Sequence, residues 1–217
     1  GGGIIKAGAA DALRQFAEKV NAPVVTTLMG LGGFPGDHDF FLGMPGMHGT
    51  YAATTAIQKS DLLVGLGVRF DDRVTGNPDF FAPHASVIHV DVDPAEIGKV
   101  RQAEIPIVGD VGKVLEQMLA AWGDRPSPDH TERLDKVTRW KNDHPVSYDQ
   151  QPAGPLKPQY VLEEMHRQTN GDAIFVSGVG QHQMWTALHW KFTKPRDWIN
   201  SGVLGTMGFG VPAAIVA

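Results

Sequence analysis

Short apolar runs alternate with amphipathic stretches along the first half of the chain. Four runs have the length and composition of buried strands, at residues 24–28, 61–67, 86–92 and 105–108. Apolar residues recur at helical spacing in residues 9–20, 51–59 and 111–122. Asp110 stands where it can cap the last of these helices. Strands that alternate with helices predict right-handed βαβ units and therefore an α/β, Rossmann-like domain built on a parallel sheet.

The pattern changes after Trp122. The next segment carries six prolines around one amphipathic helix, at about residues 131–142, which is typical of a connector between domains. A second α/β unit follows, with a helix at 159–169, strands at 173–176 and 198–199, and a helix after residue 210. We therefore expect a first domain in residues 1–122, a connector in 123–158 and the first βα units of a second α/β domain in 159–217.

A strongly polar segment directly follows the apolar run that ends at Val64. Residues 65–76 are Gly-Leu-Gly-Val-Arg-Phe-Asp-Asp-Arg-Val-Thr-Gly, with two arginines and two aspartates within five residues. Ligands bind at the carboxyl ends of parallel strands, and a guanidinium group fits a phosphate or a carboxylate. Arg69 and Arg73 therefore predict an anion site. The alternative is that both are surface residues, paired with Asp71 and Asp72.

Two further strand ends carry weaker signals. Asp91 follows the strand at 86–92, where an acid can accept a ribose hydroxyl or cap the next helix. We expect Asp93 to act as a cap and Pro94 to start a short helix. Gly1–Gly3 precede a helix and form either a phosphate-binding turn or an ordinary flexible end, because they do not match the G-x-G-x-x-G pattern.

Three glycine-containing segments carry other candidate groups. Residues 29–49 form a long loop rich in glycine and proline, and loops of this length are usually functional. Gln181–Trp185 place amide, imidazole and thioether groups after a strand, either at a loop tip or at a helix N-terminus with Gln and Met packed inward. Met207 lies between glycines in Gly205–Gly208, which can also be a simple strand-to-helix turn. His48 and His182 lie in glycine-flanked segments.

Composition narrows the classes of function. The 217 residues have a net charge of -5, 42% hydrophobic residues and no cysteine. These values exclude disulfides and thiolate metal sites, and they give no basic excess for nucleic acid. No apolar run reaches transmembrane length, and no histidines have metal-ligand spacing, so we expect a cytoplasmic protein without nucleic-acid or membrane partners and with His84 and His89 structural. Because the chain opens without Met and closes on an uncapped apolar helix, we expect a piece of a longer protein.

Six motifs, in order along nearly the whole chain, resemble the acetolactate synthase (acetohydroxyacid synthase) catalytic subunit family of thiamine-diphosphate-dependent enzymes. They are Thr27–Gly32, Gly46–Thr50, Arg69–Gly76, Asp93–Lys99, Gly180–Trp185 and Gly205–Gly210. The combination of Phe-Asp-Asp-Arg-Val-Thr-Gly with Gln-His-Gln-Met-Trp is specific. More distant thiamine enzymes, such as pyruvate oxidase and oxalyl-CoA decarboxylase, share the architecture but not both strings.

The resemblance implies a parent of three domains, in which residues 1–122 are the central FAD-binding domain and residues 159–217 open the thiamine-diphosphate-binding domain. The FAD contacts would fall on Gly2, Thr27, Leu28, Pro45, Gly46, Met47, His48, Gly67, Val68, Arg69, Phe70, Asp71, Asp91, Val92, Asp110 and Val111. Gln181 and His182 would lie near the cofactor diphosphate. Gly205, Thr206 and Met207 would lie near its two rings, with Met207 holding the cofactor in its bent form. Asp72, Arg73 and Met184 correspond to the substrate channel, where a buried arginine would pair with a 2-ketoacid carboxylate.

The resemblance also implies a transferase activity. The parent would decarboxylate pyruvate on thiamine diphosphate and join the hydroxyethyl unit to pyruvate or 2-ketobutyrate, in valine, leucine and isoleucine biosynthesis. The glutamate that activates the aminopyrimidine and the motif that binds Mg²⁺ would lie outside these residues, so we expect no catalytic residue and no metal ligand here, and no activity from this piece alone. The parent would be a homodimer or homotetramer with a small regulatory subunit. The alternatives are a non-catalytic FAD- or nucleotide-binding module and a related thiamine-dependent carboligase or decarboxylase.

Overall fold

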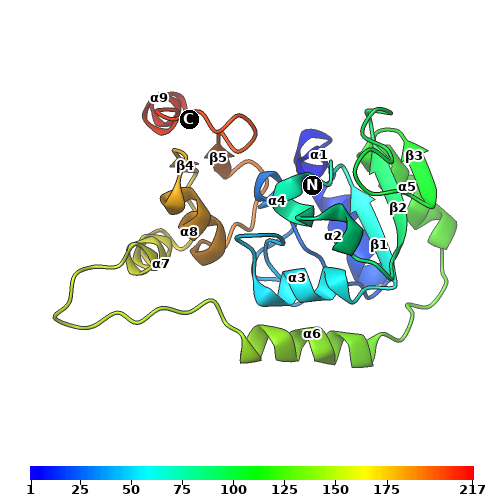
Figure 1. Cartoon of the computed structure of the whole chain (residues 1–217), viewed down its shortest axis with the longest axis horizontal. Helices are drawn as coiled ribbons and strands as arrows, with labels where there is room; N and C mark the ends of the chain where they lie inside the picture. The colour runs from blue at the N-terminus through cyan, green and yellow to red at the C-terminus, as the bar shows by residue number, and fades with distance from the viewer.

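The computed structural model describes residues 1–217 and has two lobes (Figure 1). Residues 1–122 form the larger lobe, which contains a three-stranded parallel sheet. Its strands, in spatial order, are β1 (Leu62–Leu66), β2 (Ser86–Asp91) and β3 (Ile105–Val108). Leu66 pairs with Val90, and Asp91 pairs with Val108, so all three strands end at the same edge. Pro106 has no N–H to donate, and it is tolerated because β3 is an edge strand.

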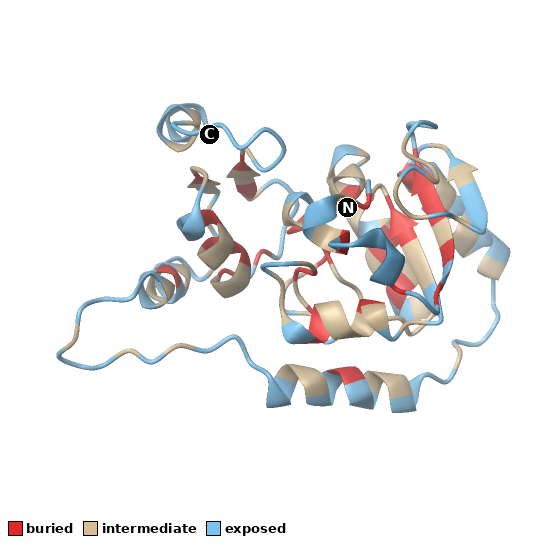
Figure 2. Cartoon of the chain, in the orientation of Figure 1, coloured by how far each residue is buried: buried red, intermediate tan, exposed pale blue.

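Helices cover both faces of this sheet. Successive strand residues point to opposite faces, so Val90 and Val87 belong to different core clusters. Val90 packs with residues of α1 (Gly2–Lys6), α2 (Ala10–Lys19) and α5 (Val111–Trp122). Val87 packs with Ile57 of α3 (Tyr51–Gln58) and with Phe70 and Phe81. Two short elements, α4 (Asp72–Thr75) and η2 (Pro78–Phe80), follow β1. Figure 2 shows the buried residues concentrated in the strands and on the inner sides of these helices.

The strand predicted at residues 24–28 does not form. Val24 makes an isolated parallel bridge to Phe41, with its N–H 2.8 Å from the carbonyl oxygen of Phe40. The N–H of Thr26 bonds the carbonyl oxygen of Gly43 at 3.2 Å. The segment is therefore held by the loop that follows it, residues 29–49, rather than by the sheet. A 3-10 helix, η1 (Leu28–Gly30), begins where the strand was expected to end.

The short helix predicted to start at Pro94 is also absent, and residues 94–98 form turns. The cause is local, because two aspartate side chains accept backbone N–H groups two residues ahead. Asp91 Oδ1 accepts from the N–H of Asp93 at 3.0 Å, and Asp93 Oδ1 accepts from the N–H of Ala95 at 2.9 Å. Such side-chain turns offer the backbone an alternative to a helix. The cap predicted at Asp93 is thus part of a turn.

The chain leaves the larger lobe through α6 (Thr131–Asp143), which lies along α3 (Figure 1). Val137 of α6 is 2% exposed and packs with Leu42, Ala52 and Ala53. Extended residues then lead to the smaller lobe. Its elements are α7 (Pro158–Thr169), β4 (Phe175–Ser177), α8 (Gln181–His189), β5 (Trp198–Asn200) and α9 (Gly210–Val216). Strands β4 and β5 are parallel, and Ser177 pairs with Asn200.

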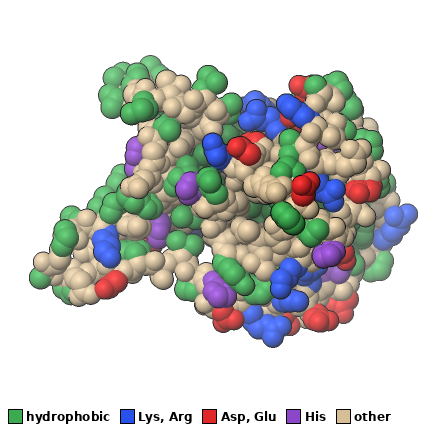
Figure 3. All heavy atoms as spheres, viewed as in Figure 1, with side chains coloured by type: hydrophobic (Ala, Val, Ile, Leu, Met, Phe, Trp, Pro, Cys, Tyr) green, Lys and Arg blue, Asp and Glu red, His purple; other side chains and the backbone are tan.

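The two lobes share part of their core. Leu31 and Met44 of the larger lobe pack with Trp190, Phe192 and Trp198 of the smaller one. The indole N–H of Trp198 donates to the carbonyl oxygen of Leu28 at 3.1 Å, and the N–H of Gly36 donates to that of Phe192 at 2.9 Å. Hydrophobic side chains also gather on the outer surface over α9, as Figure 3 shows. None of the helices combines the length and apolarity required to cross a bilayer.

Candidate functional site

The carboxyl edge of the larger sheet brings together residues from three strand ends. The N–H of Gly67, just after β1, bonds the carbonyl oxygen of Val90 at 2.8 Å. The N–H of Gly109, just after β3, bonds that of Asp91 at 2.9 Å. Asp110 follows directly and caps α5, because its Oδ1 accepts the N–H of Lys113 at 3.1 Å. Next to these residues along the chain, Val92 is exposed and Val111 is buried.

Glycines allow α1 to lie against the end of β1. The N–H of Gly3 bonds the carbonyl oxygen of Gly67 at 3.1 Å. A Cβ atom on Gly3 would lie 2.7 Å from Cα of Gly67, so a larger residue would separate the helix from the strand. On the other side of α1, Gly2 lies against Met29 of η1. The structure therefore groups the predicted residues Gly2, Leu28 and Gly67 with Thr27, which precedes η1.

The polar segment after β1 divides into a buried residue and exposed residues. The side chain of Phe70 is 4% exposed and packs edge-on against His89, with ring centroids 4.9 Å apart. Only the backbone of Phe70 is therefore left for a ligand. Both arginines form exposed ion pairs with neighbouring aspartates. A guanidinium nitrogen of Arg69 lies 3.6 Å from Oδ2 of Asp71, and one of Arg73 lies 3.6 Å from Oδ2 of Asp72. Exposed pairs of this length are weak, so both guanidinium groups stay available to an anion.

Within this segment, Arg73 is not buried as the substrate channel of the parent would require. The side chain of Arg73 is 72% exposed, because α4 is a single helical turn on the surface. Asp71 presents a different feature. Its Oδ1 atom is buried and has no hydrogen-bond partner, so it is an unsatisfied acceptor at the edge of the sheet.

A turn of the long loop packs on α4. The N–H of Met47 donates to the carbonyl oxygen of Arg73 at 3.2 Å. Gly46 has φ 97°, and a Cβ atom there would collide with the same carbonyl group. The turn spans Gly46–Gly49, where the N–H of Gly49 donates to the carbonyl oxygen of Gly46 at 2.9 Å; it is called the Met47 turn below, and Pro45 precedes it. The structure thus places two separately predicted segments, residues 45–48 and 69–73, in direct contact.

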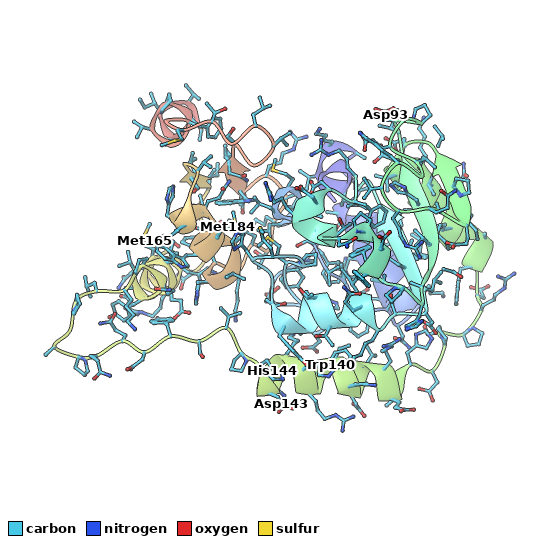
Figure 4. The ribbon with its side chains drawn as sticks, viewed as in Figure 1. Asp93, Trp140, Asp143, His144, Met165 and Met184 are labelled. Atoms are coloured by element: carbon cyan, nitrogen blue, oxygen red, sulfur yellow. The ribbon has the colours of Figure 1, made fainter.

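A cleft of about 330 Å³ lies between this turn and helix α8. Its lining residues are His48, Gly49, Gln181, Met184, Trp185 and Leu188. Met184 lies on the side of α8 toward the larger lobe (Figure 4). Three of the predicted residues, His48, Gln181 and Met184, therefore meet across the two lobes. Sequence reasoning missed Leu188, although it lies four residues after Met184 and so on the same face of a helix.

Residues 181–185 form the start of a helix and not the tip of a loop. The buried Gln183 points inward, where its Nε2 donates to Oδ1 of Asn200 at 3.0 Å. Gln181 and His182 are exposed, and their backbone N–H groups have no acceptor. Free N–H groups and the helix dipole make the start of a helix favourable for an anion. The α8 start can therefore bind a phosphate group.

A second cleft, of about 440 Å³, lies on the other side of this helix start. It brings His182 together with Met207, whose side chain is 85% exposed, and with Gly208. The remaining lining residues come from the end of β4 and from α9: Val176, Gly178, Val179, Gly210, Val211 and Ala214. Gly205 and Thr206 precede Met207 in the same turn, and the N–H of Thr206 donates to Oγ of Ser201 at 3.1 Å.

The two histidines predicted to be structural, His84 and His89, have different surroundings. His89 is fully buried, and its Nε2 lies 2.7 Å from the carbonyl oxygen of Val68, which confirms a structural role. His84 is exposed. No group of three or more His, Cys, Asp or Glu side chains converges in a way that could hold a metal ion.

Comparison with known proteins identifies the class that this fold and these clefts define. Residues 1–118 match the family described as "Thiamine pyrophosphate enzyme, central domain", and residues 178–217 match "Thiamine pyrophosphate enzyme, C-terminal TPP binding domain". The chain therefore belongs to the thiamine pyrophosphate enzymes.

Within that class, the chain is 53% identical to the acetolactate synthase large subunit of Corynebacterium glutamicum, and 53% identical to that of Mycobacterium tuberculosis. It is 47% identical to the acetolactate synthase large subunit of Haemophilus influenzae. These alignments cover 100%, 100% and 99% of this chain, which confirms the resemblance inferred from the motifs. The chain spans only 35%, 36% and 38% of the length of these relatives.

Proposed function

We propose that this chain is part of an acetolactate synthase large subunit. The parent enzyme decarboxylates pyruvate and condenses the hydroxyethyl unit with pyruvate or 2-ketobutyrate, a step of valine, leucine and isoleucine biosynthesis. One observation carries the proposal: the start of α8 and the turn at residues 205–208 line one cleft in the segment that matches the thiamine-diphosphate-binding family. The alternative function is that of a related thiamine-dependent carboligase or decarboxylase.

Thiamine diphosphate fits the cleft that contains His182 and Met207. The free N–H groups at the start of α8, with the His182 side chain beside them, suit a diphosphate. The exposed thioether of Met207 offers an apolar surface against which an aromatic ring can pack. When bound, the cofactor supplies the carbanion-stabilising chemistry, while these residues hold and orient it. The structure shows no cluster of Mg²⁺ ligands here, so we propose that the metal is bound by residues outside this segment.

FAD fits the carboxyl edge of the larger sheet. The unsatisfied Oδ1 of Asp71 can accept a hydroxyl of the flavin side chain, and the free oxygen of Asp91 can accept a ribose hydroxyl. The exposed guanidinium of Arg69 suits a phosphate. We propose that the flavin has a mainly structural role here, as the family resemblance implies.

The 2-ketoacid substrate would approach through the cleft between the lobes. Met184 lines this cleft, while Asp72 and Arg73 lie on α4, which contacts the Met47 turn at its rim. An exposed arginine can pair with a 2-ketoacid carboxylate once other parts of the enzyme exclude water. We further propose that the parent is a homodimer or homotetramer, as the family resemblance implies. All three quoted relatives are named large subunits, which supports a small regulatory subunit as a partner.

Product analysis on the full-length enzyme tests the proposal. The enzyme with thiamine diphosphate, Mg²⁺ and FAD is expected to consume pyruvate and to release acetolactate, together with the 2-ketobutyrate adduct when both ketoacids are present. Formation of acetaldehyde alone would indicate a decarboxylase instead. Flavin binding without any consumption of a ketoacid would indicate the non-catalytic module.

A further inference from the structure

Two side chains from different parts of the chain meet at the carboxylate of Glu163, on α7. Its Oε2 accepts a hydrogen bond from the hydroxyl of Tyr148 at 2.7 Å, and its Oε1 lies 2.9 Å from Nδ1 of His189. The rings of Tyr148 and His189 pack edge to face, with centroids 5.5 Å apart. Tyr148, Glu163 and His189 are called the Glu163 cluster below.

The cluster fixes the last turn of α8. His189 is the final residue of that helix, and its side chain is only 5% exposed. A carboxylate can only accept, so Nδ1 of His189 is the donor in this bond. The other titratable groups that face the cluster are Lys191, just after α8, and Tyr160, on α7.

The cluster also fixes the connector. Residues 145–156 make one hydrogen bond to the rest of the protein beyond Lys157, and it is the bond from Tyr148 to Glu163. Their other hydrogen bonds stay within the segment or reach Lys157, whose N–H donates to Oε1 of Gln150 at 2.9 Å. A long extended segment is thus tied down at a single polar point, on the same carboxylate that holds α8.

Helix α8 separates the two clefts. Gln181 and Met184 line the cleft between the lobes, whereas His182 lines the second cleft. The helix has nine residues, so His189 lies roughly 12 Å along the axis from Gln181, at 1.5 Å per residue. A short, rigid helix held at its last turn has a fixed direction at its first turn.

Burial raises the pKa of Glu163, but the hydrogen bonds from Tyr148 and His189 and the charge of Lys191 together lower it below its ordinary value. The group is therefore a carboxylate at neutral pH and can accept both bonds. Its neighbour Glu164 differs, because it bonds only Arg167 and Gln168 on its own helix.

We propose that Glu163 is a positioning residue. It holds the last turn of α8 and the connector against α7, and so sets how Gln181 and His182 are presented to the cofactor diphosphate. The inference rests on the proposed function of the α8 start. It goes beyond that function because it assigns a role to a residue that lines neither cleft.

The test compares Glu163→Ala with the matched control Glu164→Ala in the full-length enzyme. The Kd for thiamine diphosphate is measured in Mg²⁺ by quenching of tryptophan fluorescence, because Trp185 lies on α8. Glu163→Ala is expected to raise the Kd about 10-fold, as for an outer partner of a cofactor-binding residue. Glu164→Ala is expected to leave it within about twofold. Hydrogen exchange at residues 181–189 is expected to accelerate in Glu163→Ala alone.

Unchanged affinity and unchanged exchange in Glu163→Ala would overturn the inference while leaving the proposed function intact. Failure of the unmodified enzyme to bind thiamine diphosphate would overturn both. If Glu163→Ala does not fold, Glu163→Gln provides the same comparison at nearly constant volume. Its amide carries no charge and accepts through one atom only, so the hydrogen bonds to His189 and Tyr148 are weakened or reversed, and the Kd is expected to rise about two- to fivefold.

Discussion

Neighbouring residues after β1 have opposite surroundings. Phe70 is buried and has φ 52°, which turns its ring into the core. Arg69 and Arg73 remain exposed, each beside an aspartate. The residue pattern alone predicted an anion site here, and only the family resemblance divided the two arginines between FAD and the substrate channel. Arg69 follows the strand end, whereas Arg73 contacts the Met47 turn near the cleft between the lobes.

Replacing the two arginines is therefore expected to produce different defects in the full-length enzyme. Arg69→Ala should weaken FAD binding about 10-fold, because a charge-assisted hydrogen bond to phosphate is lost. Arg73→Ala should retain flavin and raise the KM for pyruvate. Flavin fluorescence and initial rates measure the two effects. Equal flavin affinity in Arg69→Ala and the unmodified enzyme would contradict the assignment.

His89 is expected to matter for stability and not for the reaction. It is fully buried and bonded to the carbonyl oxygen of Val68. His89→Ala should lower the free energy of unfolding by about 2–4 kcal/mol, because it leaves a cavity and an unpaired carbonyl group. Urea unfolding measures the change. The exposed His84→Ala is the control, with an expected effect within about 0.5 kcal/mol.

At the scale of elements, the sequence predicted most helices and strands well. The helix expected at 111–122 has those bounds, and β3 has the expected residues 105–108, because capping and apolar spacing are local signals. The strand expected at 24–28 did not form, because a strand needs a neighbouring strand to pair with, and the sequence does not specify that pairing. The helix expected at Pro94 failed because aspartate side chains formed turns instead.

The turn that contains Gly46 packs the long loop, residues 29–49, against α4. Gly46→Ala is expected to cost about 1–3 kcal/mol and to move the turn away from α4, because φ is positive and Cβ would meet the carbonyl group of Arg73. Gly8→Ala is the matched control, since φ is 65° but nothing lies within 4 Å of the added Cβ. Thermal unfolding measures both variants. A smaller loss of stability in Gly8→Ala than in Gly46→Ala would show the cost of the collision with the Arg73 carbonyl group. Equal losses would show that backbone conformation alone is responsible.

At the scale of the whole molecule, the candidate site depends on contacts between lobes. His48 and Gln181 lie on opposite sides of one cleft, although they are far apart in the sequence. Motif recognition predicted both residues, but no local pattern could predict their proximity. The contributions of Trp185 and Leu188 followed only once residues 181–189 were known to be helical. Tertiary structure thus supplied what the spacing of motifs could not.

The connection between connector and smaller lobe is expected to weaken in acid. The pKa of Glu163 is lower in the folded protein than its ordinary value, so its contribution is present above that ordinary value and is lost as pH falls through the folded pKa. The difference in free energy of unfolding between the unmodified protein and Glu163→Gln should be at most ~1 kcal/mol at pH 7, and should shrink toward pH 3. Urea midpoints across this range measure it. A difference that grew in acid would contradict the sign.

The hydrogen bond from Trp198 to Leu28 spans 170 positions in the chain. At 5–20 residues per second, synthesis from one partner to the other takes roughly 10–30 s. During that interval Leu31 and Met44, which are buried in the finished protein, have no aromatic cluster to pack against. The newly made larger lobe therefore presents apolar surface on the ribosome for many seconds, and a chaperone has time to bind it before the lobes close.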